Sequence, residues 1–258
     1  MPVLSIITVL KDDECGLRQT MESIVASSGF DRAEVEWIII DSSTDPESVK
    51  ALVSQSALEP TLIWEPPSGI YEAMNTGLNA ATGQYVYFLN AGDRLRDASV
   101  LASVVQVLKE ETPGWLYGQV AFLDGQGREV IPPAFDFQQE KRALFARGRF
   151  PPHQGTVTRR TLLQSMGGFD TKYRVAADYA AALQLSLIAE PFEMANVIAE
   201  FTEGGVSTRD WKQSLREFHQ ARVQVFNPHG TKKVAEFLRT IKLRVARGLY
   251  ESWRRRLP

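Results

Sequence analysis

Short apolar runs, each followed by a stretch with helical spacing, limit most strongly what this chain can fold into. The first third of the sequence holds four such runs, at residues 3–9, 35–40, 61–64 and 85–89. Helical spacing follows them at about 14–27, 46–56, 70–81 and 98–109. A strand that is apolar throughout is typical of a parallel sheet covered by helices on both faces. The sequence therefore predicts an α/β fold with a doubly wound, mainly parallel sheet.

The pattern changes after Pro113-Gly114. Residues 115–123 are typical of a strand, 124–127 of a turn and 128–131 of a short returning strand. Pro132-Pro133 ends this hairpin, and helical spacing returns at about 137–146, 159–166 and 176–189. The second half of the chain is thus expected to add a hairpin and further helices to the sheet.

The composition fits a globular protein and excludes several other classes. Apolar residues make up 44% of the 258 residues, and the formal net charge is −2. These totals argue against collagenous, disordered, disulfide-framework and uniformly basic nucleic-acid-binding proteins. The single Cys15 cannot form an internal disulfide and suits a reducing compartment. The apolar runs are far shorter than the ~18 residues that span a bilayer. Since no secretory signal is recognisable either, we expect a cytosolic protein.

The net charge averages two regions of opposite sign. Residues 206–258 hold 13 Lys and Arg and 4 Asp and Glu, a charge of +9, which leaves −11 for residues 1–205. An apolar stripe recurs there at steps of three and four, formed by Val234, Phe237, Leu238, Ile241, Val245, Leu249 and Trp253. The pattern predicts a basic amphipathic helix. Such a helix either lies in the interface of an anionic membrane or packs its stripe on the protein or on the second subunit of a homodimer.

Polar residues follow each of the four predicted strands. They form the segments 11–14, 41–45, 65–69 and 90–93. In open parallel sheets ligands bind beyond the carboxyl ends of the strands, so these segments predict a cleft of nucleotide size. Turns and helix caps use the same residue types. The first strand is followed neither by a phosphate loop ending in Gly-Lys-Ser/Thr nor by the three-glycine dinucleotide motif, which argues against kinase-like ATP and NAD chemistry.

The order of these segments resembles family 2 glycosyltransferases, and looks closest to the bacterial branch that builds colanic acid and similar exopolysaccharides. The resemblance rests on Asp41-Ser42-Ser43-Thr44-Asp45, residues 65–77, residues 87–93, His153-Gln154-Gly155, Gly167-Gly168-Phe169-Asp170, Ala176-Ala177-Asp178-Tyr179 and Gly204-Gly205-Val206-Ser207. It covers about residues 1–207 and implies a Rossmann-like GT-A domain, followed by a helical tail at 208–258. It further implies an inverting, hexosyltransferase-type enzyme that uses a nucleotide-diphosphate sugar.

The resemblance assigns donor-binding roles to several residues. Asp41 stands where such enzymes bind the nucleoside, and a carboxylate accepts hydrogen bonds from base N–H groups or ribose hydroxyls. Ser68-Gly69 precedes a helix whose N-terminal N–H groups suit a diphosphate. Thr8, Tyr71 and Asn75 complete the expected donor site. Thr8 is equally consistent with a buried strand residue, Asn75 with an amide satisfied in the core, and Asp41 with a helix cap.

The expected metal motif departs from the family pattern. The family usually has two acids here, since a divalent cation offsets the charge of the leaving nucleotide diphosphate. This chain has Asn90 and Gly92 at those positions, which leaves Asp93 as the only carboxylate. One carboxylate, an amide oxygen, phosphate oxygens and water complete a shell for Mg²⁺ or Mn²⁺. We therefore expect Asn90 to contact substrate and Asp93 to hold a metal that is weakly bound or dispensable.

The acid that matches the family's general base is Asp178, at the start of a predicted helix. Inverting transfer needs such a base to deprotonate the acceptor hydroxyl. Asp170 is the alternative base, and a plain helix-end acid is the other interpretation of Asp178. His153 contacts the diphosphate or a metal, or only anchors its loop.

The resemblance implies a saccharide or lipid-linked oligosaccharide as acceptor, and a lipid-linked acceptor would explain the basic tail. Two alternatives stay open. A sugar nucleotidyltransferase of the same fold is expected to carry a Gly-rich, basic loop after the first strand, whereas Lys11-Asp12-Asp13-Glu14 is acidic. A non-catalytic nucleotide- or sugar-binding protein is suggested by the missing acids of the metal motif.

Overall fold

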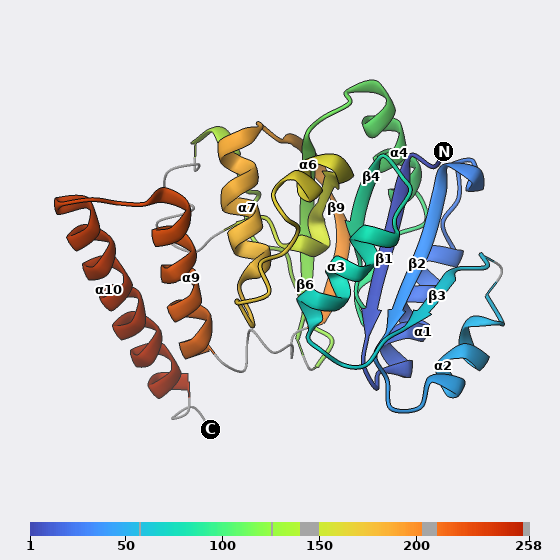
Figure 1. The fold of residues 1–258 in the computed structure, drawn as a ribbon, viewed down its shortest axis with the longest axis horizontal. Helices are drawn as coiled ribbons and strands as arrows, with labels where there is room; N and C mark the ends of the chain where they lie inside the picture. Colours follow the sequence, from blue (N-terminus) through green and yellow to red (C-terminus); the bar gives the residue numbers. More distant parts are fainter. Residues whose placement is uncertain (57, 125, 140–149, 203–210, 255–258) are drawn as a thin grey trace.

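The computed structural model shows a mixed β-sheet with helices on both faces (Figure 1). It describes residues 1–56, 58–124, 126–139, 150–202 and 211–254, with side chains up to residue 246. Within these residues nine strands form one sheet in the order β3-β2-β1-β4-β8-β6-β9-β5, and β7 pairs with β6. The strands are β1 (Leu4–Leu10), β2 (Val35–Asp41), β3 (Thr61–Trp64), β4 (Tyr85–Phe88), β5 (Arg94–Leu95), β6 (Trp115–Leu123), β7 (Glu129–Val130), β8 (Thr156–Arg159) and β9 (Phe192–Thr202).

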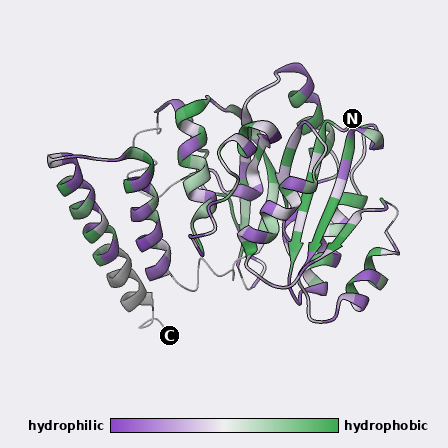
Figure 2. Cartoon of the chain, viewed as in Figure 1, coloured by the Kyte–Doolittle hydropathy of each residue, from purple (hydrophilic) through white to green (hydrophobic). Residues whose placement is uncertain are grey.

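The first four strands confirm the predicted parallel unit. β1 pairs in parallel with β2 and with β4, and β2 pairs in parallel with β3. Every residue of β1 is buried, because helices cover both faces of the sheet. The apolar strands stand out in Figure 2. Burial on both faces of the sheet therefore explains the continuous apolar runs, as the sequence indicates.

The helices divide between the two faces. Side chains of α1 (Glu14–Val25), α2 (Pro46–Val53) and α4 (Val100–Glu110) share one apolar cluster with one side of the sheet. Side chains of α3 (Ile70–Ala80), α6 (Arg160–Ser165) and α7 (Ala177–Ile188) share the other. Two short 3-10 turns, η1 (Arg32–Glu34) and η2 (His153–Gly155), complete this part.

The sheet is mixed, which differs from the expected mainly parallel arrangement. β8 lies between β4 and β6 and is antiparallel to both, and β5 is antiparallel to β9. β6 and β9 are parallel to each other, and the predicted hairpin of β6 and β7 is present. The difference has a physical reason: an apolar run indicates burial on both faces, but it carries no information about which strand lies beside it or in which direction.

The C-terminal region consists of two helices. α9 (Trp211–Phe226) lies beside α7, and α10 (Thr231–Arg254) lies beside α9, on the side away from the sheet (Figure 1). Asn227 and Gly230, both with positive φ, form the turn between them. α10 contains the predicted amphipathic helix. The resemblance segment 204–207, the proposed domain boundary at 207–208 and most of the predicted helix at 137–146 lie outside the described residues.

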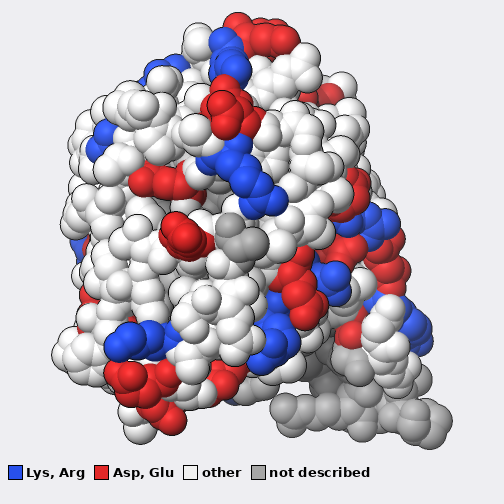
Figure 3. Space-filling view, turned by 90° about the vertical axis from the view of Figure 1, so that its right-hand side faces the viewer, with Lys and Arg blue, Asp and Glu red and all other residues white. Residues whose placement is uncertain are grey.

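Charge is mixed on the side of the molecule where α2 and β3 lie. In Figure 3 basic and acidic residues are interspersed on this face. None of the described helices has the combination of length and hydrophobicity that crossing a bilayer takes.

Candidate active site

The carboxyl ends of β2 and β3 place two acids side by side. Leu10, Asp41 and Trp64 are in register across β1, β2 and β3, and the Glu65 backbone N–H donates to the Asp41 carbonyl at 2.9 Å. Asp41 is fully buried, and its Oδ1 accepts from the Ser43 N–H at 2.8 Å. Its Oδ2 is buried without a hydrogen-bond partner among the described residues. A buried acceptor of this kind suits a donor from a ligand.

Glu65, like Asp41, has one carboxylate oxygen that is paired and one that is not, and it was not predicted as a site residue. Its Oε2 accepts from the Thr76 hydroxyl at 2.8 Å, whereas its Oε1 is buried with no partner in the described part of the chain. The signal in the sequence was an acid at a strand end, which turns also use, so the sequence alone did not distinguish it.

The N-terminus of α3 opens towards the same edge of the sheet. Ser68 and Gly69 are exposed, and Gly69 begins the helix with no side-chain cap on the first turn. Gly69 has φ +149°, and a Cβ there would lie 2.1 Å from Glu72 Oε2. The positive φ favours glycine at this position, and the N–H groups of the first turn suit an anion such as a phosphate.

A chain of polar contacts connects α3, α7, η2 and the end of β4. The Tyr71 hydroxyl donates to Asp178 Oδ1 at 3.1 Å. His153 Nδ1 lies 3.4 Å from Asp178 Oδ2, and His153 Nε2 lies 3.2 Å from the Asn90 amide nitrogen. The structure thus brings together four residues that the sequence predicted separately.

The charge of Asp178 affects both of its neighbours. Burial raises the pKa of Tyr71 well above its ordinary value, and the Asp178 charge raises it further, so Tyr71 stays a hydrogen-bond donor. Burial lowers the pKa of His153, but its hydrogen bond to Asp178 and the charges of Asp178 and Asp93 outweigh this, and the pKa lies above its ordinary value. Asp178 therefore favours a proton on His153 Nδ1, and Nε2, which faces the Asn90 amide nitrogen at 3.2 Å, is the acceptor in that contact.

Asp93 closes the turn after β4. Its carboxylate accepts from the Asn90 N–H at 3.1 Å and lies 3.5 Å from the Gln154 amide nitrogen. Burial raises the pKa of Asp93 to about 7, although His153, the Asn90 N–H and Gln154 act in the other direction. Asp93 is 4% exposed.

The donors around Asp93 fit a cation held largely by substrate. Asn90 Oδ1 is a buried acceptor without a partner among the described residues, and Asp93 is the adjacent carboxylate. The described residues contain no group of three or more metal-ligating side chains. Mg²⁺ commonly uses only one or two protein carboxylates and takes its other ligands from phosphate and water, so this small donor set is sufficient.

Three other predicted residues lie outside this cluster. The Thr8 hydroxyl is fully buried, donates to the Leu89 carbonyl at 2.8 Å and accepts from Trp37 Nε1 at 3.0 Å. The Asn75 amide exchanges two hydrogen bonds with the backbone of Phe169, each 2.8 Å long. Asp170 pairs with Lys172 at 2.9 Å. Their side chains are satisfied by the protein itself, so they are left out of the site proposed below.

Comparison with known proteins identifies the family. The sequence model described as Glycosyl transferase family 2 matches residues 5–172. The chain belongs to glycosyl transferase family 2. The match includes β2–β4, nearly all of β1, Asn90, Asp93 and His153, and it ends before Asp178.

Relatives of this family 2 chain are glycosyltransferases. An uncharacterized glycosyltransferase of Mycobacterium tuberculosis is 31% identical over 213 residues, which are 80% of this chain and 78% of the relative. A PGL/p-HBAD biosynthesis glycosyltransferase of Mycobacterium bovis is 31% identical over 182 residues, which are 69% of this chain and 67% of that protein. The chain is accordingly a glycosyltransferase, and the particular resemblance to colanic acid enzymes stays a prediction.

Solved structures confirm the GT-A-like α/β fold. TarS of S. aureus superposes with a TM-score of 0.66 at 18% identity, over 94% of this chain and 43% of TarS. The mannosyltransferase PcManGT from Pyrobaculum calidifontis, in complex with GDP-Man and Mn²⁺, gives 0.64 at 19% identity, over 89% of this chain and 65% of that one. At these identities the likeness concerns the fold.

Proposed function

We propose that this chain is an inverting glycosyltransferase that uses a nucleotide-diphosphate sugar, with Asp178 as its general base. The observation that carries the proposal is the pair of contacts that Tyr71 and His153 make with the two oxygens of the Asp178 carboxylate. The His153 contact to Asn90, just beyond β4, ties this carboxylate to the edge where the polar strand ends lie. Inverting transfer needs a carboxylate so placed to accept the proton of the acceptor hydroxyl.

The reaction follows from this arrangement. The acceptor oxygen attacks the anomeric carbon from the face opposite the diphosphate, and its proton passes to Asp178. The new C–O bond forms as the bond to the diphosphate oxygen breaks, which inverts the configuration. Because separate neighbours hold Oδ1 and Oδ2, the carboxylate keeps one orientation towards the acceptor.

The donor is expected to lie along the ends of β2, β3 and β4. Asp41 Oδ2 and Glu65 Oε1 are buried acceptors without a partner among the described residues, and base N–H groups or ribose hydroxyls would supply the missing donors. Ser68, Gly69 and the first turn of α3 suit the diphosphate. Asn90 and Asp93 would hold Mg²⁺ or Mn²⁺, which offsets the charge of the leaving nucleotide diphosphate when bound. Structures of similar fold support this donor class: TarS has been solved with UDP-GlcNAc and PcManGT with GDP-Man.

A donor panel tests the activity. The purified chain is incubated with Mn²⁺, nucleotide-diphosphate sugars and saccharide acceptors, and the released nucleotide diphosphate and the anomeric configuration of the product are measured. We expect inversion, and a fall in kcat of ~10²–10⁴-fold for Asp178→Asn with donor affinity retained. Donor binding without release would favour the non-catalytic alternative, and pyrophosphate formed from a nucleoside triphosphate and a sugar phosphate would favour a nucleotidyltransferase.

We further propose that the acceptor is a lipid-linked saccharide of exopolysaccharide assembly and that α10 contacts the membrane surface. The apolar stripe of α10 faces outwards: Val234, Phe237, Leu238, Ile241 and Val245 are 43–58% exposed. Basic residues accompany it at Lys232, Lys233, Lys242 and Arg244. Each basic residue near an anionic surface contributes about 1 kcal/mol of attraction. Pairing of two copies through this stripe would instead bring like charges together.

Vesicle flotation tests the membrane contact. We expect the chain to float with phosphatidylglycerol-containing vesicles and not with phosphatidylcholine vesicles, and the double change Phe237→Ser and Leu238→Ser to abolish flotation. Val130→Ser on β7 is the matched control, because Val130 is 60% exposed and lies outside the stripe. A dimer in sedimentation that the double change dissociates, without vesicle binding, would contradict the membrane proposal.

A further inference from the structure

Two charged side chains of α9 are buried against the part of the chain that carries Asp178. Glu217 and Arg222 are each 2% exposed, although charged residues are almost never fully buried without partners. Both are directed at the beginning of α7, where Asp178 is the second residue.

Glu217 holds the backbone that leads into α7. Its Oε2 accepts from the Val175 N–H at 2.8 Å, and its Oε1 accepts from the Arg174 N–H at 3.1 Å. Gln213, one turn earlier on α9, donates to the same carboxylate at 2.7 Å. The N-cap residue of α7, Ala176, supplies no side-chain cap of its own. A carboxylate from a different helix therefore fixes the two residues before the helix start.

Arg222 holds the residue directly after Asp178. Its Nη1 lies 3.3 Å from the Tyr179 hydroxyl, and the Tyr179 N–H donates to Asp178 Oδ1 at 2.8 Å. The Tyr179 ring is fully buried against Phe150 and against Phe218 of α9, with centroid separations of 5.0 and 4.4 Å. Asp178 thus has residues fixed by α9 on both sides in sequence.

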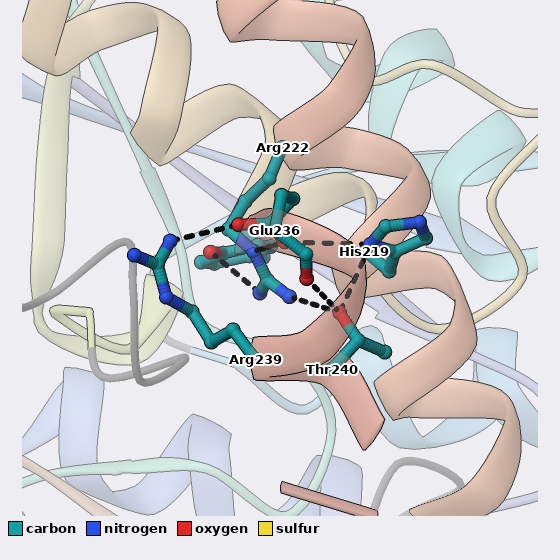
Figure 4. Close-up of polar contacts among 6 residues, drawn as sticks. His219, Arg222, Glu236, Arg239 and Thr240 are labelled. Atoms are coloured by element: carbon teal, nitrogen blue, oxygen red, sulfur yellow. Dashed lines mark hydrogen bonds and ion pairs between the residues drawn. The ribbon is translucent and has the colours of Figure 1, made fainter. Parts of the chain in front are cut away.

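The last helix holds Arg222 in turn. Arg222 Nε pairs with Glu236 of α10 at 2.6 Å, and Arg222 Nη2 donates to the Thr240 hydroxyl at 3.2 Å (Figure 4). Glu236 also pairs with Arg239 at 2.8 Å and contacts His219 at 3.3 Å. The guanidinium can reach Tyr179 and Thr240 at once because its donors form a rigid planar fork.

We propose that Glu217 and Arg222 are positioning residues for the transfer reaction, and that α9 and α10 exist in this chain partly to aim Asp178. The proposal rests on the proposed role of Asp178 as base. Tyr71 and His153 contact the carboxylate itself, whereas α9 sets where its backbone lies. A displacement of about 1 Å in a reacting group lowers turnover by up to ~10²-fold, so loss of this support reduces kcat and leaves donor binding intact.

The test uses the full chain with two independent changes. Glu217→Gln keeps the shape of the side chain and replaces one of its two acceptors by a donor. Arg222→Met with Glu236→Met replaces the buried ion pair by apolar side chains of similar volume, an exchange that folded proteins often tolerate. We expect each to lower kcat by ~10-fold or more with unchanged KM and binding stoichiometry for the donor. The acid limb of the kcat–pH profile should shift as well, which a smaller folded fraction does not produce.

Arg239→Gln is the matched control. Arg239 contacts the same Glu236 but is 44% exposed in its side chain, so its loss leaves the Arg222 pair in place and kcat within ~2-fold of the wild type. Wild-type kcat and pH profile in folded Glu217→Gln and in the double methionine variant would overturn the inference. Failure of the proposed function shows differently, as wild-type turnover in Asp178→Asn.

Discussion

Buried polar side chains have opposite surroundings in two regions of the molecule. At the strand ends, three buried side-chain atoms have no hydrogen-bond partner among the described residues: Asp41 Oδ2, Glu65 Oε1 and Asn90 Oδ1. Between α7, α9 and α10, by contrast, Glu217, Arg222 and Glu236 each have two or more partners.

The contrast distinguishes a region suited to binding a ligand from a region that holds helices in place. Buried polar groups in folded proteins are almost always paired, so unpaired acceptors gathered at one edge call for an explanation, and a ligand that donates hydrogen bonds provides one. A fully paired network between helices leaves nothing for a ligand and instead fixes their relative position. Changes in the first region should therefore alter affinity, and changes in the second should alter stability and alignment.

The largest expected effect is on the stability of the paired network. Glu236→Ala leaves Arg222 buried without its carboxylate, and breaking a buried pair in this way lowers the free energy of unfolding by about 3–5 kcal/mol. Urea denaturation of the full chain measures the loss. A change below about 1 kcal/mol would show that the network is not the support that its geometry indicates.

A smaller effect, on the affinity for nucleotide, is expected at the strand ends where the unpaired acceptors lie. Asp41→Asn keeps the oxygen that Ser43 uses and removes the unpaired one, so the affinity for nucleotide diphosphates should fall ~10–100-fold with little loss of stability. Calorimetric titration with UDP and GDP measures it. Thr8→Val is the control: the Thr8 hydroxyl is paired within the protein, so this change should lower the melting temperature and leave nucleotide affinity as it is. Equal affinity losses in both variants would break the distinction.

Asp93 gives a pH-dependent test of the same edge. Because its pKa is about 7 in the fold against an ordinary value of 3.8, the folded state holds the proton more tightly. Its contribution to stability is full below pH 3.8 and is lost as the pH rises through 7, with a slope of at most about 1.4 kcal/mol per pH unit. Asp93→Asn should flatten the stability profile between about pH 4 and 7, measured by urea denaturation. An unchanged slope would contradict the burial of an ionisable carboxyl here.

The smallest effect on stability is expected for an ion pair that is formed but exposed to solvent. Lys50 and Glu47 on α2 lie 3.7 Å apart at the surface. Lys50→Ala should change the free energy of unfolding by less than about 0.5 kcal/mol, because water screens such pairs. A loss comparable to that of Glu236→Ala would mean that pairing alone, rather than burial, decides stability.

The sequence predicted the regions where local pattern determines structure. Apolar runs predicted β1–β4, and helical spacing predicted α1, α3, α4 and α7, because burial on both faces or on one stripe leaves a direct trace in the sequence. It did not predict the antiparallel position of β8, since strand pairing is not a local property. The tail at 208–258 was expected to be helical, but only the helix with the apolar stripe was delimited, and its division into α9 and α10 was not predicted.

Site residues that belong to family motifs were predicted from the sequence, and residues outside such motifs were not. Asp178, His153 and Asn90 were found through the family resemblance, and the structure links them and Tyr71 in one chain of contacts. Glu217 and Arg222 were not singled out, because a charged residue on a helix is usually solvent-exposed. Only the burial of these two side chains against another element reveals them. Thr8 is the opposite case: the sequence predicted it as a substrate-binding residue, but its hydroxyl is hydrogen-bonded inside the protein.

The order of Asp41, Asn90 and Glu236 in the sequence has a consequence for biosynthesis. Asp41 ends β2 and Asn90 follows β4, whereas the carboxylate that pairs with Arg222 lies much later, on α10. Because a chain is synthesised from its N-terminus, the strand ends leave the ribosome well before α10 does. The groups proposed to bind nucleotide are therefore present during synthesis before the groups proposed to aim Asp178.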